Sequence, residues 1–378
     1  MDSVLASAQK KQNELIAFLR KLVECESPSE DPAAIGRFVD LLASELSGSV
    51  TTQLHASTQY GPTVQFAFAP SQPGHDEQIL VLGHSDTVYP FGTLSSMPFM
   101  EKDGRLWGPG VLDMKGGIAF FVFAMRCLGE LDIPVRRRVL LQLNADEEIG
   151  SPSSRELTES EARKSAAVLV LEPGTGLEGK AKTARKGVGD YTVEVRGKAA
   201  HAGVDFGSGA SAILELAHQI QHISKFTDLE RGLTVNPGVV SGGTRTNVIA
   251  EFARVEVDVR VAHLADAAEL DRKFQTLQPS DSRCLIEVSG GLNRPPMERT
   301  EGVAMLFSKA RELALEIGVA LQESSTGGGS DGNFTAALAP TLDGIGAVGE
   351  GAHSPGESIL ISRIADRIAL LAKLVAAL

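Results

Sequence analysis

Two kinds of apolar pattern alternate along the first 171 residues. Apolar side chains at three- and four-residue spacing predict amphipathic helices over 3–24 and 32–47, and a further helical pattern covers 115–131. Continuous short apolar runs predict strands that are covered on both faces. These runs are 78–83, 137–143 and 166–171. Because strands alternate with helices, we predict an α/β fold whose mostly parallel sheet is flanked by helices.

The pattern changes at about residue 184. From there to residue 294, strand and helix patterns follow one another in the order β-α-β-β-α-β, with "YTVEVRG" and "NVIAEFARVEVDVRVA" among the strands. That order is typical of a split βαβ sandwich, a compact α+β unit that can be inserted whole. Helical patterns return at 302–317 and near 359–377. We therefore predict one domain from 1–183 and 295–378, and an inserted domain over 184–294.

The composition limits the partners and the location. A formal net charge of −12 over 378 residues argues against nucleic acid and anionic membranes as main partners. No apolar run approaches the roughly 20 residues of a membrane span, and the N-terminus has no basic start followed by an apolar core. Cys25, Cys127 and Cys284 are widely spaced, so we expect free thiols and a cytoplasmic protein.

Histidine and carboxylate side chains follow the predicted strands where each strand ends. The carboxyl ends of parallel strands meet at one edge of a sheet, so these groups are expected to share one pocket. Taken singly, each has a simpler explanation, since acidic runs are usually solvated and a single Asp can cap a helix. Their joint occurrence, with no cysteine, favours a site for zinc, cobalt or manganese. The group consists of His84, Asp86, Asp113, Glu147, Glu148, Glu172 and, in the glycine-rich loop "GEGAHSPGE", His353.

Spacing divides the work among these residues. Asp86 lies two residues beyond His84 in extended chain and hence on the same side, where it can accept the second ring proton of that histidine. Glu147 and Glu148 are adjacent and point to opposite sides. One of them is therefore expected to bind metal and the other to act as a free base.

Six motifs together resemble the dinuclear-zinc amidohydrolase and peptidase family, metallopeptidase family 20, which includes carboxypeptidase G, acetylornithine deacetylase, succinyl-diaminopimelate desuccinylase and aminoacylase. They run in order from about residue 78 to 358. The motifs are "GHSDTVYP", "GPGVLDMKGG", "NADEEIGS", "LEPGTG", "GKAAHAG" and "GEGAHSPGE". Three further stretches, "TARKGVG", "NRPPME" and "GGGSDGNF", look most like the glutamate carboxypeptidase branch.

The resemblance implies a role for each site residue. His84 and His353 would bind one Zn²⁺ each, Asp113 would bridge the two ions, and Glu148 and Glu172 would complete one site each, with Co²⁺ or Mn²⁺ as substitutes. Glu147 would be the general base and Asp86 would orient His84. A cis peptide is expected after Asp113. The inserted domain would be a lid through which the protein forms a homodimer, and His201 in "GKAAHAG" would stabilise the oxyanion, in relatives from across the dimer.

The substrate is expected to be a small peptide or an N-acyl amino acid. In relatives, a free carboxylate is held at positions that match Asn247 and Arg260, and the turn at 326–334, with Gly328 and Gly329, is expected to contribute. Arg260 as a solvent-facing residue and the turn as plain surface remain alternatives. We expect a metallocarboxypeptidase that releases a C-terminal amino acid, and glutamate is the amino acid expected. The alternatives are an N-acyl-amino-acid deacylase and a non-catalytic binding relative, which would have no need of Glu147.

Overall fold

The computed structural model describes residues 2–378, which divide into two compact units. Unit 1 contains the residues up to Ala184, Arg299–Ser325 and Ser330–Leu378, and unit 2 contains Arg185–Glu298 and Thr326–Gly329. The segment predicted as an insertion, 184–294, covers nearly the same stretch as Arg185–Glu298. The short return of Thr326–Gly329 to unit 2 was not predicted, and because of it the chain passes between the units four times.

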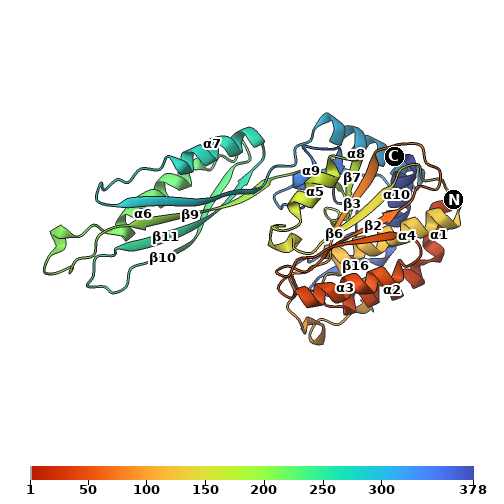
Figure 1. Cartoon of the computed structure of the whole chain (residues 1–378), viewed down its shortest axis with the longest axis horizontal. Coiled ribbons are helices and arrows are strands. Elements are labelled where there is room, and N and C mark those ends of the chain that lie inside the picture. The colour runs from red at the N-terminus through yellow and green to blue at the C-terminus, as the bar shows by residue number, and fades with distance from the viewer. Residues whose placement is uncertain (1) are drawn as a thin grey trace. The chain divides into compact units, whose positions relative to one another are not determined.

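A six-stranded sheet forms the centre of unit 1 (Figure 1). Its order is β1-β2-β6-β3-β7-β14, with parallel pairing of β3 to β6, β3 to β7 and β7 to β14, and antiparallel pairing at β1 and β2. The sheet is therefore mostly parallel, as predicted. The strands are β1 (Thr51–His55), β2 (Thr63–Phe68), β3 (Gln78–His84), β6 (Val139–Asn144), β7 (Ser165–Val170) and β14 (Thr341–Leu342).

Helices cover both faces of this sheet, which explains why its central strands are continuous apolar runs. Ile79 and Val81 of β3 belong to the larger core on one face, while Leu80 and Leu82 belong to a smaller core on the other. Helices on the larger core are α1 (Ser3–Lys10), α2 (Gln12–Glu24), α3 (Pro32–Glu45), α4 (Gly116–Glu130), α8 (Glu301–Glu316) and α10 (Ile364–Ala377). On the smaller core lie α5 (Arg155–Ala162) and α9 (Gly332–Thr335). The helix predicted over 3–24 is interrupted at Lys11.

A second, small sheet of unit 1 joins two loops. Its order is β15-β16-β5-β4, and β16 (Ser358–Leu360) pairs antiparallel with β5 (Arg105–Trp107). The outer strands are β15 (Gly349–Glu350) and β4 (Met100–Lys102). One two-stranded sheet pairs β8 (Ala181–Arg185) with β13 (Glu323–Thr326) where the chain leaves unit 1.

Unit 2 is an antiparallel four-stranded sheet of order β10-β11-β9-β12 with two helices packed on it (Figure 1). Val193, Val255 and Phe274 are fully buried in its core. The element order is the predicted β-α-β-β-α-β. The elements are β9 (Gly187–Arg196), α6 (Ala212–Ile223), β10 (Thr234–Gly242), β11 (Phe252–Val261), α7 (Leu264–Gln275) and β12 (Leu285–Arg294).

Two further expectations can be compared with the structure. Cys25, Cys127 and Cys284 are free thiols, as predicted. Over residues 2–378, no helix is both long enough and apolar enough to cross a lipid bilayer.

Candidate metal centre and substrate-binding residues

The carboxyl edge of the unit 1 sheet collects the predicted metal ligands. His84 is the last residue of β3, which lies between β6 and β7 and runs parallel to both. Glu147 and Glu148 begin the short helix η3 (Glu147–Ile149) just after β6, and Glu172 follows β7 by two residues. Because parallel strands end at the same edge, these side chains approach one another across the sheet.

Five side chains form two groups of potential ligands that share Asp113. The groups are His84, Asp113 and Glu172, and Asp113, Glu148 and His353, and within each the ligand atoms lie within 4.8 Å of one another. Asp113 Oδ1 is 3.2 Å from Nε2 of His84, and Oδ2 is 3.3 Å from Nε2 of His353. The two oxygens of one carboxylate therefore face different groups. The peptide bond between Asp113 and Met114 is cis, as the resemblance implied.

The chemistry of this donor set fits divalent cations. Imidazole nitrogens and carboxylate oxygens without thiolates suit zinc, cobalt or manganese. Glu148 Oε1 is buried and has no hydrogen-bond partner among the described residues, while Glu148 Oε2 is 3.3 Å from His353 Nε2. An unpaired buried carboxylate oxygen is costly unless a proton or a cation compensates it.

When no cation is bound, protons offset the negative charge of the carboxylates in this cluster. Hydrogen bonds to Asp113 and Glu148 raise the pKa of His353 to about 10. Burial opposes the charged form of Asp113, but hydrogen bonds from His353 and His84 outweigh it and lower the pKa of this carboxyl group. Burial raises the pKa of Glu148. Divalent cations would replace these protons, so metal binding at this cluster is expected to release protons.

Asp86 orients His84 and the Glu147–Glu148 turn by different atoms. Nδ1 of His84 is 2.9 Å from the backbone oxygen of Asp86 and 3.5 Å from its carboxylate. The contact to the ring thus runs mainly through the backbone carbonyl, not through the side chain as expected. The carboxylate instead accepts hydrogen bonds from the backbone N–H groups of Glu147 and Glu148, both at 3.2 Å, and from Ser29 at 2.8 Å.

Asp146, the first carboxylate of "DEE", had no predicted role. It is fully buried, and its carboxylate accepts hydrogen bonds from the backbone N–H of Ser153 at 2.6 Å and from the hydroxyls of Ser153 and Ser154 at 2.7 and 2.5 Å. Asp146 therefore fixes the loop that follows Glu147 and Glu148. The two serines that supply these three donor groups stand in "GSPSS", which is the signal that could have revealed this role.

Glu147 and Glu148 differ in surroundings, but they lie in the short helix η3 and not in extended chain, so the alternation of a strand is not the cause. The Glu148 side chain faces His353, whereas Glu147 lines a narrow space with His84, Glu172 and Met114. Asp331 lines the same space and accepts hydrogen bonds from Asn144 at 2.6 Å and Ser151 at 2.5 Å. Asp331 stands in "GGGSDGNF" but had not been singled out.

His201 lies in unit 2 with its ring fixed by the backbone that follows it. Its Nδ1 accepts hydrogen bonds from the N–H groups of Gly203 and Val204, both at 3.1 Å. A ring nitrogen that accepts two hydrogen bonds carries no proton, so the proton of the neutral ring is on Nε2. The ring is exposed, and Asn247 lies beside it, since the Asn247 carbonyl accepts a hydrogen bond from Ala202 at 3.0 Å.

His201 and Arg260 lie toward opposite ends of the unit 2 sheet. Arg260 pairs with Val188 at one end of β9, and Phe252 pairs with Arg196 at the other. These pairs are eight residues apart along β9 (188 to 196), or about 26 Å at the usual rise of a strand. The segments that continue β9 and precede β11 remain paired beyond Arg196, up to the bridge between His201 and Val248. One small substrate cannot touch His201 and Arg260 of the same chain.

Three arginines meet the turn of Thr326–Gly329 in unit 2. Arg260 donates to the carbonyl of Gly327 at 3.4 Å, and Arg185 donates to those of Gly328 and Gly329 at 3.1 and 2.9 Å. A Cβ at Gly329 would lie 2.7 Å from Cδ of Arg294. The carbonyl groups of the turn thus accept hydrogen bonds from guanidinium groups.

Of the three, Arg185 and Arg294 are buried and Arg260 is held by Asp258. Only 4% of Arg185 and 5% of Arg294 is exposed. Arg260 donates to the Asp258 carboxylate through Nε at 3.1 Å and Nη2 at 2.7 Å. Sequence reasoning proposed Arg260 alone. Arg185 and Arg294 stand in "TARKGVG" and "NRPPME", two stretches already noted for their resemblance.

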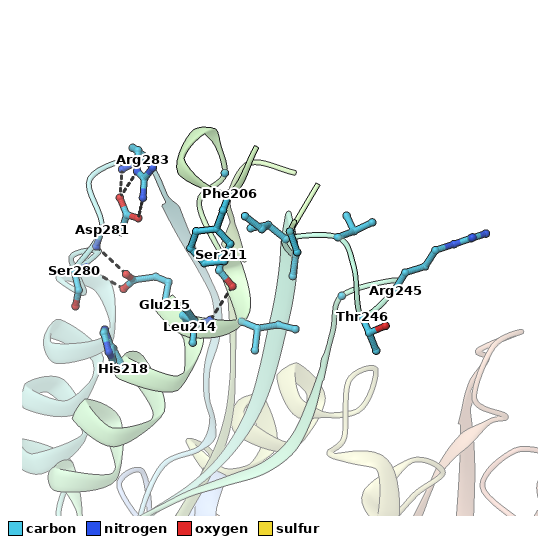
Figure 2. Close-up of a pocket in the computed structure, with 17 residues that line it drawn as sticks. Phe206, Ser211, Leu214, Glu215, His218, Arg245, Thr246, Ser280, Asp281 and Arg283 are labelled. Carbon is cyan, nitrogen blue, oxygen red and sulfur yellow. Dashed lines mark hydrogen bonds and ion pairs between the residues drawn. The ribbon is translucent and has the colours of Figure 1, made fainter. Parts of the chain in front are cut away.

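A cavity of about 550 Å³ lies in unit 2, and Ala202, the residue after His201, is part of its lining (Figure 2). Phe206, Ile213 and Leu214 form its apolar wall and are 65%, 46% and 62% exposed. On the polar side, Glu215 accepts hydrogen bonds from the N–H groups of Ser280 and Asp281, both at 2.9 Å. Figure 2 shows Arg245 pointing away from these polar residues.

An α/β sheet whose carboxyl edge carries two imidazoles and three carboxylates, one of them shared, defines a metal-dependent hydrolase. Residues 80–377 match the sequence profile of Peptidase family M20/M25/M40, and the chain belongs to this family. The resemblance inferred from the six motifs is thereby confirmed.

Named relatives agree with this assignment. The chain is 30% identical over 385 residues to carboxypeptidase G2 of Pseudomonas sp. (strain RS-16), covering 99% of this chain and 92% of that protein. It is 34% identical over 194 residues to acetylornithine deacetylase of Myxococcus xanthus, covering 48% of this chain and 49% of that protein. The fold matches a Bacillus subtilis dinuclear metal binding peptidase with a TM-score of 0.69 and 15% identity, over 98% of both chains.

Proposed function

We propose that this hydrolase uses two zinc ions to cleave an amide bond next to a free carboxylate, releasing a C-terminal amino acid, with glutamate as the expected product. The observation that carries the proposal is the shared carboxylate of Asp113, whose two oxygens face two separate sets of ligands. Its similarity to carboxypeptidase G2 over nearly the whole chain supports the carboxypeptidase reaction.

The ligand roles follow from the two groups. His84 and Glu172 would hold one ion, Glu148 and His353 the other, and Asp113 would contact both. Two such ions, when bound, polarise the substrate carbonyl and lower the pKa of water. Asp86 keeps Nε2 of His84 directed at the centre, because its backbone carbonyl engages Nδ1.

Glu147 is the general base in this proposal. Its carboxylate accepts a proton from the attacking water as the water oxygen bonds to the carbonyl carbon. When the bond between that carbon and the amide nitrogen breaks, Glu147 returns the proton to the leaving amine. Glu147 suits this part because it lines the space beside His84 and Glu172, while the neighbouring Glu148 faces His353.

His201 donates to the substrate oxygen that gains negative charge. The two backbone N–H groups on Nδ1 leave Nε2 as the protonated nitrogen of the neutral ring. A fixed donor of this kind stabilises the developing oxyanion without having to reorient during the reaction.

The arginines around Thr326–Gly329 support recognition of an acidic product. Arg185, Arg260 and Arg294 bring three positive charges to one turn, with Asp258 as the carboxylate that holds Arg260. Guanidinium groups pair with carboxylates in a planar, two-point geometry. Glutamate offers two carboxylates for such pairing, one more than a neutral amino acid.

A substrate panel tests the reaction. The zinc-loaded protein should hydrolyse folyl-glutamate and peptidyl-glutamate with a kcat/KM at least about tenfold above that for acetyl-amino acids, the factor expected from one additional charge-assisted hydrogen bond. Arg260→Ala should raise KM for the glutamate substrates. Arg272→Ala, on the exposed side of α7, is the matched control and should leave KM unchanged.

A preference for acetyl-amino acids would instead favour the second candidate, an N-acyl-amino-acid deacylase. The similarity to acetylornithine deacetylase over about half of the chain is the observation that supports this candidate. An Arg260→Ala protein with unchanged KM for every substrate would remove Arg260 from the carboxylate site.

We further infer a homodimer formed through unit 2. β10 is an edge strand of the described sheet, and its Val239 and Val240 are each 58% exposed, as are large parts of Ile213 and Leu214 on α6. An apolar edge of this kind is normally covered. A second copy is the fitting occupant, because His201 and Arg260 of one chain cannot reach the same substrate.

Mixing two inactive variants tests whether His201 acts across this dimer. Glu147→Gln and His201→Ala should each be impaired, His201→Ala by about 10²–10³-fold in kcat through loss of one oxyanion donor. After dissociation and random reassociation, half of the dimers contain one chain of each kind. In these, the His201→Ala chain keeps Glu147 and receives His201 from its partner, so about one quarter of wild-type activity should return.

If His201 acts within its own chain, no mixed dimer has a complete site and the activity stays at the level of the parents. The matched control is a mixture of Glu147→Gln with His222→Ala, an exposed histidine at the other end of α6. Because His222→Ala should be fully active alone, that mixture must show the average of its two parents.

A further inference from the structure

Glu357 is a fully buried carboxylate at the end of the loop that carries His353. Oε1 accepts hydrogen bonds from the backbone N–H groups of Leu112 at 2.7 Å and Asp113 at 2.9 Å. Oε2 accepts from the N–H of Gly110 at 3.1 Å and from the hydroxyl of Tyr89 at 2.5 Å. Each oxygen therefore has two donors.

These four donors belong to two different ligand-bearing segments. Tyr89 lies five residues beyond His84 (84 to 89), and Gly110, Leu112 and Asp113 form the turn that presents the shared ligand. Glu357 itself lies four residues beyond His353 (353 to 357). The Glu357 side chain thus links the three segments that carry His84, Asp113 and His353. These three residues include members of both ligand groups.

The backbone supports the same connection. β16 begins at Ser358, next to Glu357, and pairs with β5, which ends at Trp107 shortly before the Asp113 turn. The backbone oxygen of Glu357 also accepts a hydrogen bond from Gly108 at 3.4 Å. The carboxylate therefore acts at a junction whose strands already hold the two loops side by side.

We propose that Glu357 is the positioning residue of the metal centre: its carboxylate sets the position of the Asp113 carboxylate relative to His353, and so determines the affinity for both metal ions. This inference rests on the metal centre proposed above. Groups that orient metal ligands from behind commonly change metal affinity by about 10–100-fold when they are replaced.

The charge and the shape of a carboxylate are both needed for this task. Three N–H groups and one O–H group converge on Glu357, and all four are donors. A glutamine side chain has nearly the same shape, but its NH₂ group would face the N–H groups of Leu112 and Asp113 at the Oε1 position, or that of Gly110 at the Oε2 position. Two donors cannot satisfy each other, so the Asp113 turn would have to move.

The decisive experiment compares metal affinities of Glu357→Gln and the wild type. Metal-free proteins are titrated with Co²⁺ and followed by the visible absorption of the bound ion, and Zn²⁺ affinity is measured by competition with a chromophoric chelator. Glu357→Gln should bind both ions about 10–100-fold more weakly, with a changed Co²⁺ spectrum. Tyr89→Phe removes one of the four donors and should weaken binding by about three- to tenfold.

Glu161→Gln is the matched control. Glu161 is also a buried glutamate of unit 1, but it binds Gln78 and Lys164 at the opposite end of β3 and β7, each at 2.8 Å. It should lower the thermal stability of the metal-free protein and leave metal affinity unchanged. A purely structural role for Glu357 predicts that both variants behave alike.

Three outcomes overturn the proposal. Affinities of Glu357→Gln within twofold of the wild type would show that the carboxylate does not set the ligand position. If Glu357→Gln does not fold, unchanged affinity and spectrum in Tyr89→Phe would have the same meaning. If the wild type itself binds fewer than two ions, the proposed metal centre is wrong and this inference fails with it. If the wild type binds two ions and Glu357→Gln binds them equally well, only the proposed role of Glu357 is wrong.

Discussion

Alanine in place of Asp113 should remove both metal ions from the protein together and abolish hydrolysis. The reason is that the two oxygens of its carboxylate face different ligand groups, with Oδ1 beside His84 and Oδ2 beside His353. No other side chain belongs to both groups of potential ligands found among the described residues. Metal content after dialysis, measured by mass spectrometry against protein concentration, checks this expectation.

His353→Ala serves as the control for the proposed bridging role of Asp113. His353 belongs to one group only, so this variant should weaken one ion selectively and retain about one metal per chain. Thermal unfolding of the metal-free proteins shows whether the variants are folded. Two tightly bound ions in Asp113→Ala would contradict the bridging assignment.

Glutamine in place of Glu147 should lower kcat by about 10²–10⁴-fold while both metal ions remain bound, because the loss of a general base has a cost of that size. Glutamine keeps the shape of the side chain but cannot accept the proton of the attacking water. The comparison of kcat, KM and metal content in one preparation separates a lost base from a lost ligand.

The adjacent Glu148 provides the matched comparison. Glu148→Gln changes the neighbouring side chain in the same way, but Glu148 belongs to the group of Asp113 and His353 and should lose affinity for one ion. If Glu147→Gln loses metal and Glu148→Gln does not, the two roles have to be exchanged. Activity of Glu147→Gln within tenfold of the wild type would exclude it as the base.

The central strands were predictable because β3, β6 and β7 are buried on both faces and largely apolar in sequence. A continuous apolar run that ends in a charged residue locates both the strand and its exit, which is why His84, Glu148 and Glu172 could be expected at one edge. β1 was missed for the opposite reason, since its residues are largely exposed and show no apolar alternation. The very short β15 pairs with the nearby β16, and β16 in turn depends on pairing with the distant β5.

Residues that act through distant partners were not predictable from local pattern. Glu357 stands in a motif quoted for His353, yet its role depends on N–H groups 244 to 247 residues away. Arg185 and Arg294 are separated from Gly329 by the rest of unit 2 or by a helix of unit 1, and only the folded chain brings them together. The carboxylate of Asp86 likewise finds the N–H groups of Glu147 and Glu148 across 61 and 62 residues.

The return of Thr326–Gly329 to unit 2 limits how this protein can be recombined with its relatives. A chimera that exchanges only Arg185–Glu298 would separate Arg185, buried in unit 2, from the carbonyls of Gly328 and Gly329 that accept its hydrogen bonds. The turn would then meet a foreign arrangement of arginines, even though every strand of the transplanted sheet was intact. A module suitable for exchange therefore consists of two pieces of sequence, one long and one of four residues, which have to be moved together.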